Sequence, residues 1–334
     1  MKNNSVEGYA KGHAMTDEIA AADAAGLERS CSSGATAGGS ARGAPDGSAR
    51  GAPDGSARGA PDGSARGAPD GIIQAPSSRG IERIEARFHG NGFEPHRHDT
   101  YAIGLTLSGV QTFQYRGAAR ASLPGNVIVL HPDEVHDGAA GTDDGLRYRM
   151  LYLPPERLIE AAGGSRGLPF VPDPIIADAG FRQCLTEALD DLEAEPQDLL
   201  LDDLIGRIAT SLWHHADGKG SVAGTPRAQQ AVLRCRDYLQ ANSERVVSSE
   251  ELEEVSGFDR YTTARQFRKL LGTSPHRYLV MRRLDRAKVL LSQGGSLADI
   301  AADTGFADQA HFTRHFKKTF GMTPGRWMAL RRSA

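Results

Sequence analysis

Residues 300–327 read IAADTGFADQAHFTRHFKKTFGMTPGRW, and this stretch decides the fold of the C-terminal part of the chain. Phe312 and Phe316 are four residues apart, which places both on one face of a helix. Asp308 is a residue type that caps helix N-termini, and Gly321 readily takes the left-handed conformation that ends a helix. The spacing therefore predicts a helix that begins at about Asp308 and ends before Gly321.

The two faces of this predicted helix differ in chemistry. The inward face is expected to be apolar and to consist of Ala310, Phe312, Phe316 and Phe320. The outward face is polar and basic and consists of Gln309, His311, Thr313, Arg314, Lys317 and Lys318. A short helix capped by Ser296 is expected before it, and a turn at Gly305-Phe306 joins the two helices.

The same unit occurs once more, earlier in the chain. The matching positions are Gly257-Phe258 for Gly305-Phe306, Arg265-x-Phe267 for Arg314-x-Phe316, and Gly272-x-x-Pro275 for Gly321-x-x-Pro324. Ser248 or Ser249 is expected to cap the short helix, and Asp259 to cap an exposed helix over 260–271. A long helix over 275–292 then joins the first unit to the second.

A short helix, a turn and an exposed basic helix form the plan of a helix-turn-helix. The major groove of B-DNA, about 12 Å wide, admits one helix. The inner face of that helix must be apolar to anchor it, and its outer face must reach bases and phosphates. Two such units joined by one helix could enter two successive major-groove segments about 34 Å apart. The duplication therefore predicts a DNA-binding module.

The near-neutral total charge of −3 conceals two opposite parts. Residues 226–334 contain 19 Lys and Arg against 11 Asp and Glu, a net charge of +8, and the rest of the chain carries −11. A basic module on an acidic remainder indicates a polyanionic partner, and nucleic acid is the usual one. Basic surfaces are often only solvated, so the charge is weak evidence for nucleic-acid binding by itself. It supports the prediction that the spacing of apolar residues makes.

Residues 228–334 resemble the DNA-binding domain of the AraC/XylS transcription regulators, because the pattern IA…GF…F-x-R-x-F-K-x-x-x-G-x-x-P is close to that family's signature. The resemblance implies that the helices over 260–271 and 308–320 are recognition helices. The base-reading positions would then be Tyr261, Thr262, Arg265, Gln309, His311, Thr313 and Arg314. The phosphate-binding positions would be Arg268, Lys269, Lys317 and Lys318. A surface ion pair is the alternative role for Arg265 and Arg314.

Residues 81–153 change to a period of two. Short β-rich runs such as 103–107 and 127–130 alternate with turn signals. Many strands at this spacing predict a barrel or jelly roll. The stretches HRHDTYAIGLTLSGVQTFQYRG and LPGNVIVLHPDEVHDG resemble the cupin-like sensor domain of AraC-type regulators. The resemblance implies a ligand-sensing barrel over 79–174.

Three histidines of the predicted barrel allow three explanations. A His-x-His pair on one strand places two imidazoles on one face, and a third from a facing strand could complete a metal site. The metal-binding cupin pattern also needs a Glu four or five residues further on, where this chain has Ala102 and Ile103. We therefore expect no metal, and the histidines either bind a small ligand or only pack the core. The effector-binding candidates are His96, His98, Tyr101, Tyr115 and His136.

Composition and periodicity assign the remaining segments. Residues 39–70 are four copies of GSARGAPD, which offers little apolar surface to bury, so residues 1–78 are expected to be a disordered tail. Apolar stripes that include Leu200 predict a helical pair over 175–216, which in the resembled family packs against the barrel and can carry dimer contacts. Residues 217–227, rich in Gly, Asp, Ser and Pro, are expected to form a linker.

Composition also excludes several classes of protein. Three distant cysteines, Cys31, Cys184 and Cys235, exclude a disulfide-stapled scaffold and a cysteine-rich zinc module. No apolar run reaches the ~20 residues that span a bilayer, and the first thirty residues lack the apolar core of a signal peptide. We expect a cytoplasmic protein with no membrane partner.

Together these patterns predict an α+β multidomain chain: a disordered N-terminal tail, a cupin-like β barrel with a helical pair, and an all-α double helix-turn-helix domain. The expected function is a sequence-specific DNA-binding transcription regulator that responds to a small-molecule effector, with no catalytic residues and no cofactor. Its partners would be double-stranded operator DNA and the effector, and further candidates are RNA polymerase and a second copy of the chain. Two alternatives stay open: a cupin-type metalloenzyme or metal sensor fused to a DNA-binding domain, and a regulator whose barrel only dimerises.

Overall fold

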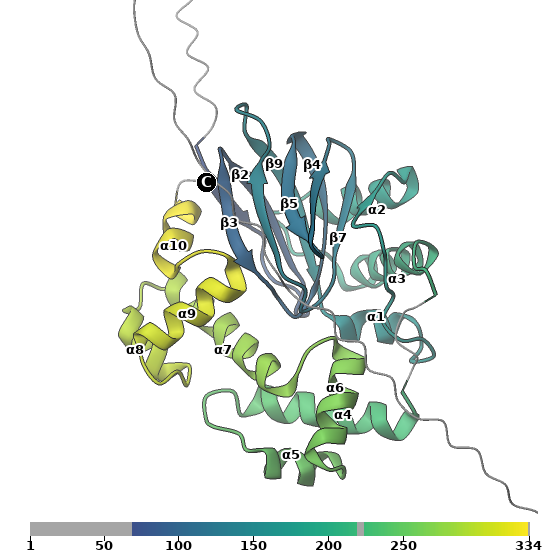
Figure 1. The fold of residues 1–334 in the computed structure, drawn as a ribbon, viewed down its shortest axis with the longest axis vertical. Helices are drawn as coiled ribbons and strands as arrows, with labels where there is room; N and C mark the ends of the chain where they lie inside the picture. The colour runs from purple at the N-terminus through teal and green to yellow at the C-terminus, as the bar shows by residue number, and fades with distance from the viewer. Residues whose placement is uncertain (1–68, 219–223, 333–334) are drawn as a thin grey trace, which may run out of the picture. The chain divides into compact units, whose positions relative to one another are not determined.

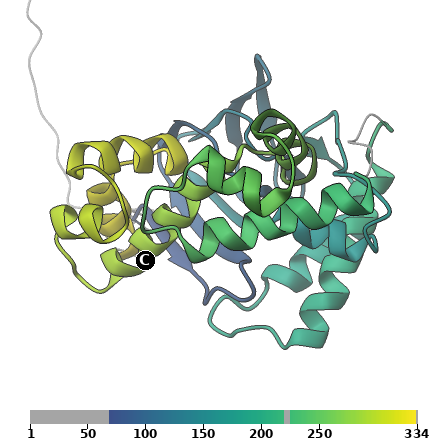
Figure 2. The same ribbon diagram turned by 90° about the horizontal axis from the view of Figure 1, so that it is seen from below.

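The computed structural model describes residues 69–218 and 224–332. Most of the predicted N-terminal tail, including its repeats up to residue 68, lies outside the described residues. Strands, blue to teal in Figures 1 and 2, occupy the first described part of the chain, and helices, green to yellow, occupy the last part. This arrangement confirms the predicted α+β fold class. Within the described residues, no helix has the length and apolar character needed to cross a membrane.

The β-rich domain consists of two antiparallel sheets. The six-stranded sheet contains, in spatial order, β1 (Gly71–Gln74), β2 (Glu82–Phe88), β9 (Leu146–Leu153), β4 (Tyr101–Gly109), β7 (Val127–Leu130) and β10 (Ile175–Ile176). The four-stranded sheet contains β3 (Asn91–His96), β8 (His136–Ala140), β5 (Gln111–Tyr115) and β6 (Ala118–Ser122). The predicted strand-rich region is thus confirmed as a double-sheet structure.

The strand β7 shows why this region contains long β-branched runs. Alternate side chains of a strand point to opposite faces of the sheet. Ile128 belongs to a core that also holds Phe113 from the other sheet. Val127 and Val129 instead belong to a second core, which the helices complete. A strand between two apolar layers must be apolar on both faces, so its sequence does not alternate.

The second core is closed by α1 (Pro155–Ala161), α2 (Ala179–Leu189) and α3 (Asp198–His214). The predicted helical pair corresponds to α2 and α3. The expectation that Leu200 faces inward is wrong, because about half of its side chain is exposed (49%). Leu201, Leu204 and Ile208 already fill the inner face of α3 at helical spacing, and Leu200 lies one position off that face.

Two predicted boundaries differ from the structure. The strand β1 lies inside the range 1–78 that was expected to be disordered, and Ile72 of β1 is buried and pairs with Ala86 of β2. The short apolar run that follows the last repeat therefore begins the β-rich domain. The strand β10 lies inside the range 175–216 that was assigned to helices, and it pairs with β7.

The described residues 224–332 contain seven helices: α4 (Pro226–Ala241), α5 (Ser249–Ser256), α6 (Arg260–Leu271), α7 (Pro275–Ser292), α8 (Leu297–Asp303), α9 (Gln309–Phe320) and α10 (Pro324–Arg332). The predicted caps are confirmed. Ser248 begins α5, Asp259 begins α6 and Asp308 begins α9, each accepting a hydrogen bond from the backbone of its helix. The left-handed glycines Gly272 and Gly321 end α6 and α9.

We call α5 with α6 the first unit, and α8 with α9 the second unit. The two units belong to different cores. Phe267 of the first unit packs with Val232 and Leu239 of α4. Phe312 and Phe316 of the second unit belong to the core that also contains the facing sheets. The second unit is therefore continuous with the β-rich domain, whereas the first unit is anchored on α4.

Candidate functional site

The helices α6 and α9 present most of their predicted DNA-binding side chains to solvent. The side chain of Tyr261, for example, is 77% exposed. The exposed positions are Tyr261, Arg265, Arg268, Gln309, Arg314 and Lys318. The half-buried positions are Thr262, Lys269, His311, Thr313 and Lys317. None of these side chains is buried, so each remains accessible to a partner.

Arg265 and Arg314 occupy corresponding positions in the two units, and neither forms an ion pair with a residue that the structure describes. Arg265 donates one hydrogen bond, at 3.0 Å, to Oγ1 of Thr262 on its own helix. His311 is more constrained, because its ring lies 4.6 Å from the ring of His315 and 5.6 Å from that of Phe306. The two arginines thus keep donor groups free for a partner, and His311 has less freedom.

The inward faces of α6 and α9 each contain a threonine that periodicity did not predict. Ala310 was expected to face inward, which is wrong because it is exposed, and Thr319 is buried instead. The face set by Phe312 and Phe316 passes through Thr319 and not through Ala310. In the first unit, buried Thr263 hydrogen-bonds Ser256 of α5 at 2.8 Å, which fixes the angle between the two helices through a polar contact.

The C-terminal end of α9 lies against β3. The backbone amide of Glu94 donates to the carbonyl of Gly321 at 2.8 Å, and that of Arg97 donates to the carbonyl of Lys318 at 3.2 Å. These strand amides satisfy carbonyls that the end of a helix leaves without partners. The Nζ of Lys317 also lies 2.7 Å from a carboxylate oxygen of Glu94. The β-rich domain thus holds the end of the second recognition helix.

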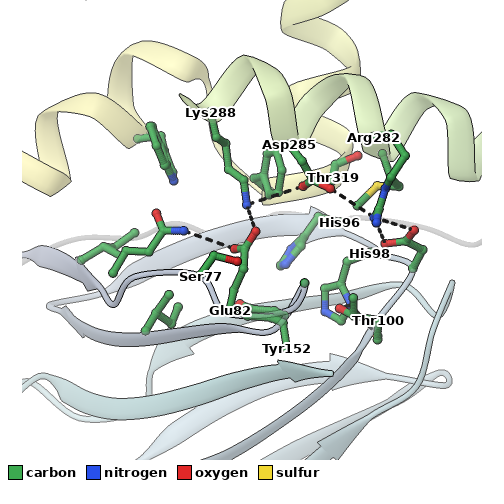
Figure 3. Close-up of a pocket in the computed structure, with 18 of the residues that line it drawn as sticks. Ser77, Glu82, His96, His98, Thr100, Tyr152, Arg282, Asp285, Lys288 and Thr319 are labelled. Atoms are coloured by element: carbon green, nitrogen blue, oxygen red, sulfur yellow. Dashed lines mark hydrogen bonds and ion pairs between the residues drawn. The ribbon is translucent and has the colours of Figure 1, made fainter. Parts of the chain in front are cut away.

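A cavity of about 230 Å³ lies at this junction. Figure 3 shows strands on one side of it and helices on the other. The strand side includes β1, β2 and the segment after β3, and the helix side includes α7, α9 and α10. Its aromatic wall consists of Phe93, Tyr152, Phe320 and Trp327. Both the β-rich domain and the second unit would therefore contact a molecule bound there.

Five charged side chains alternate in sign along the cavity, and we call them the charge chain: Asp99, Arg282, Asp285, Lys288 and Glu82. Arg282 lies 3.1 Å from Asp99 and 3.1 Å from Asp285, and Lys288 lies 3.7 Å from Asp285 and 2.5 Å from Glu82. Figure 3 shows Arg282 and Lys288 reaching from α7 toward the strands. Burial raises the pKa of Asp285 to about 6. The charge chain links the two domains and carries one more acid than base.

Two of the predicted effector-binding histidines, His96 and His98, line the cavity, and His136 lies next to them. The ring centroids are 4.3 Å apart for His96 and His136 and 4.9 Å apart for His98 and His136. Each Nδ1 lies 2.8 to 3.0 Å from a backbone carbonyl oxygen. A carbonyl can only accept, so each Nδ1 carries the proton and each Nε2 has a free lone pair.

Burial keeps these three imidazoles neutral. It lowers the pKa of His136 to about 4, and it lowers the pKa of His96 and His98 well below the usual value, with a further contribution from the neighbouring rings. His98 is only 5% exposed, and its Nε2 has no hydrogen-bond partner among the described residues. Within that same part of the chain, no three His, Cys, Asp or Glu side chains are grouped in a way that could hold a metal ion.

The structure does not bring Tyr101 and Tyr115 to the cavity. Both side chains are fully buried, near His131. The hydroxyl of Tyr101 donates to the carbonyl of Pro169 at 2.8 Å, and that of Tyr115 lies 3.0 Å from Nδ1 of His131. Burial raises the pKa of both phenols, so they remain neutral donors in the core.

Sequence reasoning missed the residues of the charge chain. Arg282, Asp285 and Lys288 are spaced by three residues along α7, which places them on one side of the helix. The sequence contains this stripe, but the apolar periodicity that predicts the long helix does not single out its charged positions. Glu82 and Asp99 carry no comparable signal, because nothing in the strand pattern indicates that a helix from the C-terminal part will face them.

The fold and these surfaces define a class of protein: a regulator in which a β-rich domain with a ligand-sized cavity adjoins a pair of helix-turn-helix units. Comparison with known families agrees. Residues 79–209 match the AraC-like ligand binding domain, and residues 252–330 match a helix-turn-helix domain. The chain belongs to the AraC family of transcription regulators, and it is a DNA-binding regulator with a ligand-binding domain.

Individual relatives extend the match over most of the described chain. The HTH-type transcriptional regulator YbfI of Bacillus subtilis (strain 168) is 29% identical, covering 68% of this chain and 85% of its own length. The transcriptional activator RhaS of Yersinia pestis (strain Pestoides F) is 27% identical, covering 74% of this chain and 93% of its own length. The structure of ToxT from Vibrio cholerae has the same fold, with a TM-score of 0.56 at 11% identity, covering 75% of this chain and 98% of ToxT.

Proposed function

We propose that α6 and α9 bind double-stranded operator DNA and that a small molecule in the cavity changes this binding. The observation that carries the proposal is the equivalence of Arg265 and Arg314, which are both exposed and free of ion pairs with described residues. A guanidinium group can bond O6 and N7 of guanine in bidentate fashion, which contributes about 1–3 kcal/mol of discrimination between bases.

The other predicted positions form two groups according to where they lie along each helix. Tyr261, Thr262, Gln309, His311 and Thr313 lie near the start of each recognition helix, where base edges are read. Arg268, Lys269, Lys317 and Lys318 lie in the last turn of α6 or α9, where they would bind phosphates. Phosphate contacts position a protein on DNA without specifying sequence.

Arginine substitutions test the DNA-binding half of the proposal. A genome-wide binding experiment first identifies an operator. Arg265→Ala and Arg314→Ala should then each weaken operator binding by roughly 5- to 150-fold while binding to random DNA changes little. Arg268→Ala should weaken both alike. Arg286→Ala, which removes an exposed arginine of α7 outside the recognition helices, is the matched control. Equal losses on operator and random DNA for Arg265→Ala and Arg314→Ala would contradict base reading.

The cavity supports the effector half of the proposal. A ligand shifts an equilibrium only if it interacts differently with the two states. Thr319 and Phe320 of α9 line the cavity together with strand residues, so a bound molecule would contact the second recognition helix directly. One crystal structure of ToxT is described with a bound unsaturated fatty acid. That ligand is a property of ToxT, and the likeness between the two chains concerns the fold.

Finer aspects of the function follow from the same features. Adjacent leucines of α3, Leu199 (86% exposed) and Leu200, support contact between two copies through the helical pair. Replacing both by Gln should then lower the sedimentation mass from dimer to monomer.

We assign the chain a binding role and no catalysis, in keeping with relatives that are named as regulators. Operator DNA as the partner favours a cytoplasmic location, and transcription in vitro with RNA polymerase would separate activation from repression.

A further inference from the structure

We infer that the cavity binds a small organic cation, an amine on an apolar body of about one ring, whose ammonium group lies against Asp285. The inference rests on the proposed function in taking this cavity as the effector site. It adds the chemical class of the effector, which the charges, the walls and the size of the cavity each constrain.

The charge chain has a net charge of −1 when its members are ionised, because it has three carboxylates and two cations. Both cations form ion pairs with carboxylates of the chain: Arg282 with Asp99 and Asp285, and Lys288 with Glu82 and Asp285. Of their nitrogens, the buried Nε of Arg282 has no hydrogen-bond partner among the described residues. Asp285 is the member with the most accessible side chain, at 35%, and it lines the cavity. The charge that the cavity offers to a ligand is therefore negative. A ligand carboxylate would add a fourth negative charge to the three carboxylates of the charge chain, and their repulsion would oppose binding.

The three neighbouring histidines His96, His98 and His136 provide an independent observation on the ligand's head group. The Nε2 atom of His98 is a buried acceptor that no described residue supplies with a donor, and burial keeps the ring neutral. Leaving a buried acceptor unpaired is unfavourable, and a ligand that supplies a hydrogen recovers part of this cost. An ammonium group can donate up to three hydrogen bonds, whereas an ionised carboxylate can donate none.

The aromatic wall is suited to the same class of ligand. A cation near an aromatic face is attracted by the ring, and the attraction is stronger where water is excluded. The cavity already contains one such contact, because the Nζ of Lys288 lies 4.8 Å from the centre of the Phe320 ring. Tyr152, Phe93 and Trp327 supply further rings for the apolar body.

The size of the cavity limits the body of the ligand. An apolar cavity of about 150 Å³ is known to bind benzene. At about 230 Å³, this cavity has room for one ring with a short side chain. A long acyl chain would require the β-rich domain and the second unit to move apart. The size therefore favours compact ring amines over lipids.

A series of compounds with the same ring tests the head group. Benzylamine, benzyl alcohol and benzoate are titrated into the full-length protein, and binding is followed by calorimetry and by the shift in melting temperature, which rises by mass action when a ligand binds the folded state. Benzylamine should bind at least tenfold more tightly than the other two. Equal or tighter binding of benzoate or benzyl alcohol would overturn the inference, and so would the absence of binding by benzylamine, 2-phenylethylamine and cyclohexylamine at millimolar concentration.

Substitution of Asp285 tests the site. Asp285→Asn should weaken benzylamine at least tenfold, and Asp303→Asn, an exposed aspartate of α8, should leave the affinity unchanged. Asn resembles the protonated carboxyl that burial favours, so the variant should fold, and the wild-type compound series gives a second readout. Unchanged benzylamine affinity in Asp285→Asn would place the amine elsewhere and overturn the assignment.

The pH dependence gives a third readout. The groups that face Asp285 are Arg282 and Lys288 on its own helix, Glu82 on β2 and Asp99 in the segment after β3. Asp285 has a pKa of about 6, so it loses its charge as the pH falls through this value. Benzylamine affinity should fall about fourfold between pH 7.5 and pH 5.5. A flat profile over this range would contradict contact with an ionised Asp285.

Operator binding with and without benzylamine separates the two proposals. If benzylamine binds through Asp285 but the operator affinity is unchanged, the effector role of the cavity fails and the amine site stands. If arginine variants confirm operator reading but the cavity prefers benzoate or benzyl alcohol, the amine inference fails and the regulatory function stands.

Discussion

The two helix-turn-helix units follow one sequence pattern and have different surroundings. The first unit packs on α4, with Phe267 in a core that contains no strand residue. The second unit shares a core with the sheets, with Phe316 and Ile72 in the same cluster. The repeated sequence pattern therefore sets the helices and caps of each unit, but it does not set which elements the unit packs against. The second unit is the one through which the β-rich domain can act on DNA binding directly.

Contacts along the junction have the same asymmetry. The backbone amides of Glu94 in β3 and of Arg97, just after β3, donate hydrogen bonds to the end of α9, and Glu94 forms an ion pair with Lys317. The first unit meets the β-rich domain away from its strands, where α6 contacts α1 and Gly272, at the end of α6, lies close to Pro132. If this difference matters for regulation, perturbing the second unit should disturb the β-rich domain, and perturbing the first should not.

The largest expected effect comes from the buried phenylalanines. Phe267→Ala and Phe316→Ala should each lower the free energy of unfolding by about 3–5 kcal/mol, because each removes a fully buried ring. Urea denaturation measures this loss. Hydrogen exchange then distinguishes the sites: Phe316→Ala should speed exchange in β3, whereas Phe267→Ala should speed it in α4. Faster exchange in β3 for both variants would show that the two cores act as one.

Acid should weaken the β-rich side of the junction next. Burial lowers the pKa of His136 to about 4, so the unfolded chain binds a proton near pH 6.5 while the folded chain does not. Stability should therefore fall as the pH drops from about 6.5 toward 4, with His136 alone contributing up to about 3 kcal/mol. The first unit, residues 249–271, contains no histidine.

Denaturation at pH 7 and pH 5 measures this loss, and His136→Gln should reduce it. His276→Gln, which replaces an exposed imidazole, serves as the control. Hydrogen exchange at pH 5 should increase in β3 and β8 before it increases in α6. A stability that does not change between pH 7 and pH 5 would show that the buried imidazoles are protonated as easily as in the unfolded chain.

The helical part of the fold was predictable because its signals are local. Asp259 and Asp308 mark helix starts, and Gly272 and Gly321 mark helix ends, through interactions within a few residues. Periodicity failed where inward positions are polar, as at Thr319, because a method that seeks apolar stripes passes over a buried hydroxyl. It also failed at Ile72, where a strand of four residues follows a low-complexity repeat.

The candidate sites were predictable to different degrees for the same reason. The proposed DNA-binding residues lie on two helices whose exposed faces follow from local spacing. Arg265 and Arg314 could therefore be selected as candidates from the sequence alone. The cavity depends on tertiary contacts: Glu82 and Lys288 are far apart in the chain and 2.5 Å apart in space. The pattern His-x-His allowed His96 and His98 to lie near His136, but their proximity to α7 depends on how the β-rich domain meets the second unit.

The helix caps should give a smaller effect that is alike in the two units. Asp259 accepts hydrogen bonds from Tyr261 and Thr262, and Asp308 accepts one from His311. Replacing either Asp by Ala should lower the free energy of unfolding by about 1 kcal/mol, because a cap acts within its own turn. Denaturation of both variants tests this equality. A much larger loss for Asp308→Ala would mean that the start of α9 also supports the junction.

The smallest expected effect concerns the ion pair between Glu94 and Lys317. Exposed pairs contribute only about 0.2–1 kcal/mol, so Glu94→Gln should hardly change stability. It frees Lys317 for a phosphate, and it should therefore raise operator affinity by at most about fivefold and steepen the dependence on salt by about one counterion. Titrations at several salt concentrations measure both quantities.

The control for this variant is Asp144→Asn, which removes the same charge from an exposed position of the β-rich domain. If both variants raised the affinity equally, the gain would come from the overall loss of negative charge. If only Glu94→Gln did so, β3 would be restraining the second recognition helix through its side chain as well as its backbone. Lys269 of α6 forms no ion pair with a residue that the structure describes, so it should contribute the same phosphate contact in the wild type and in both variants.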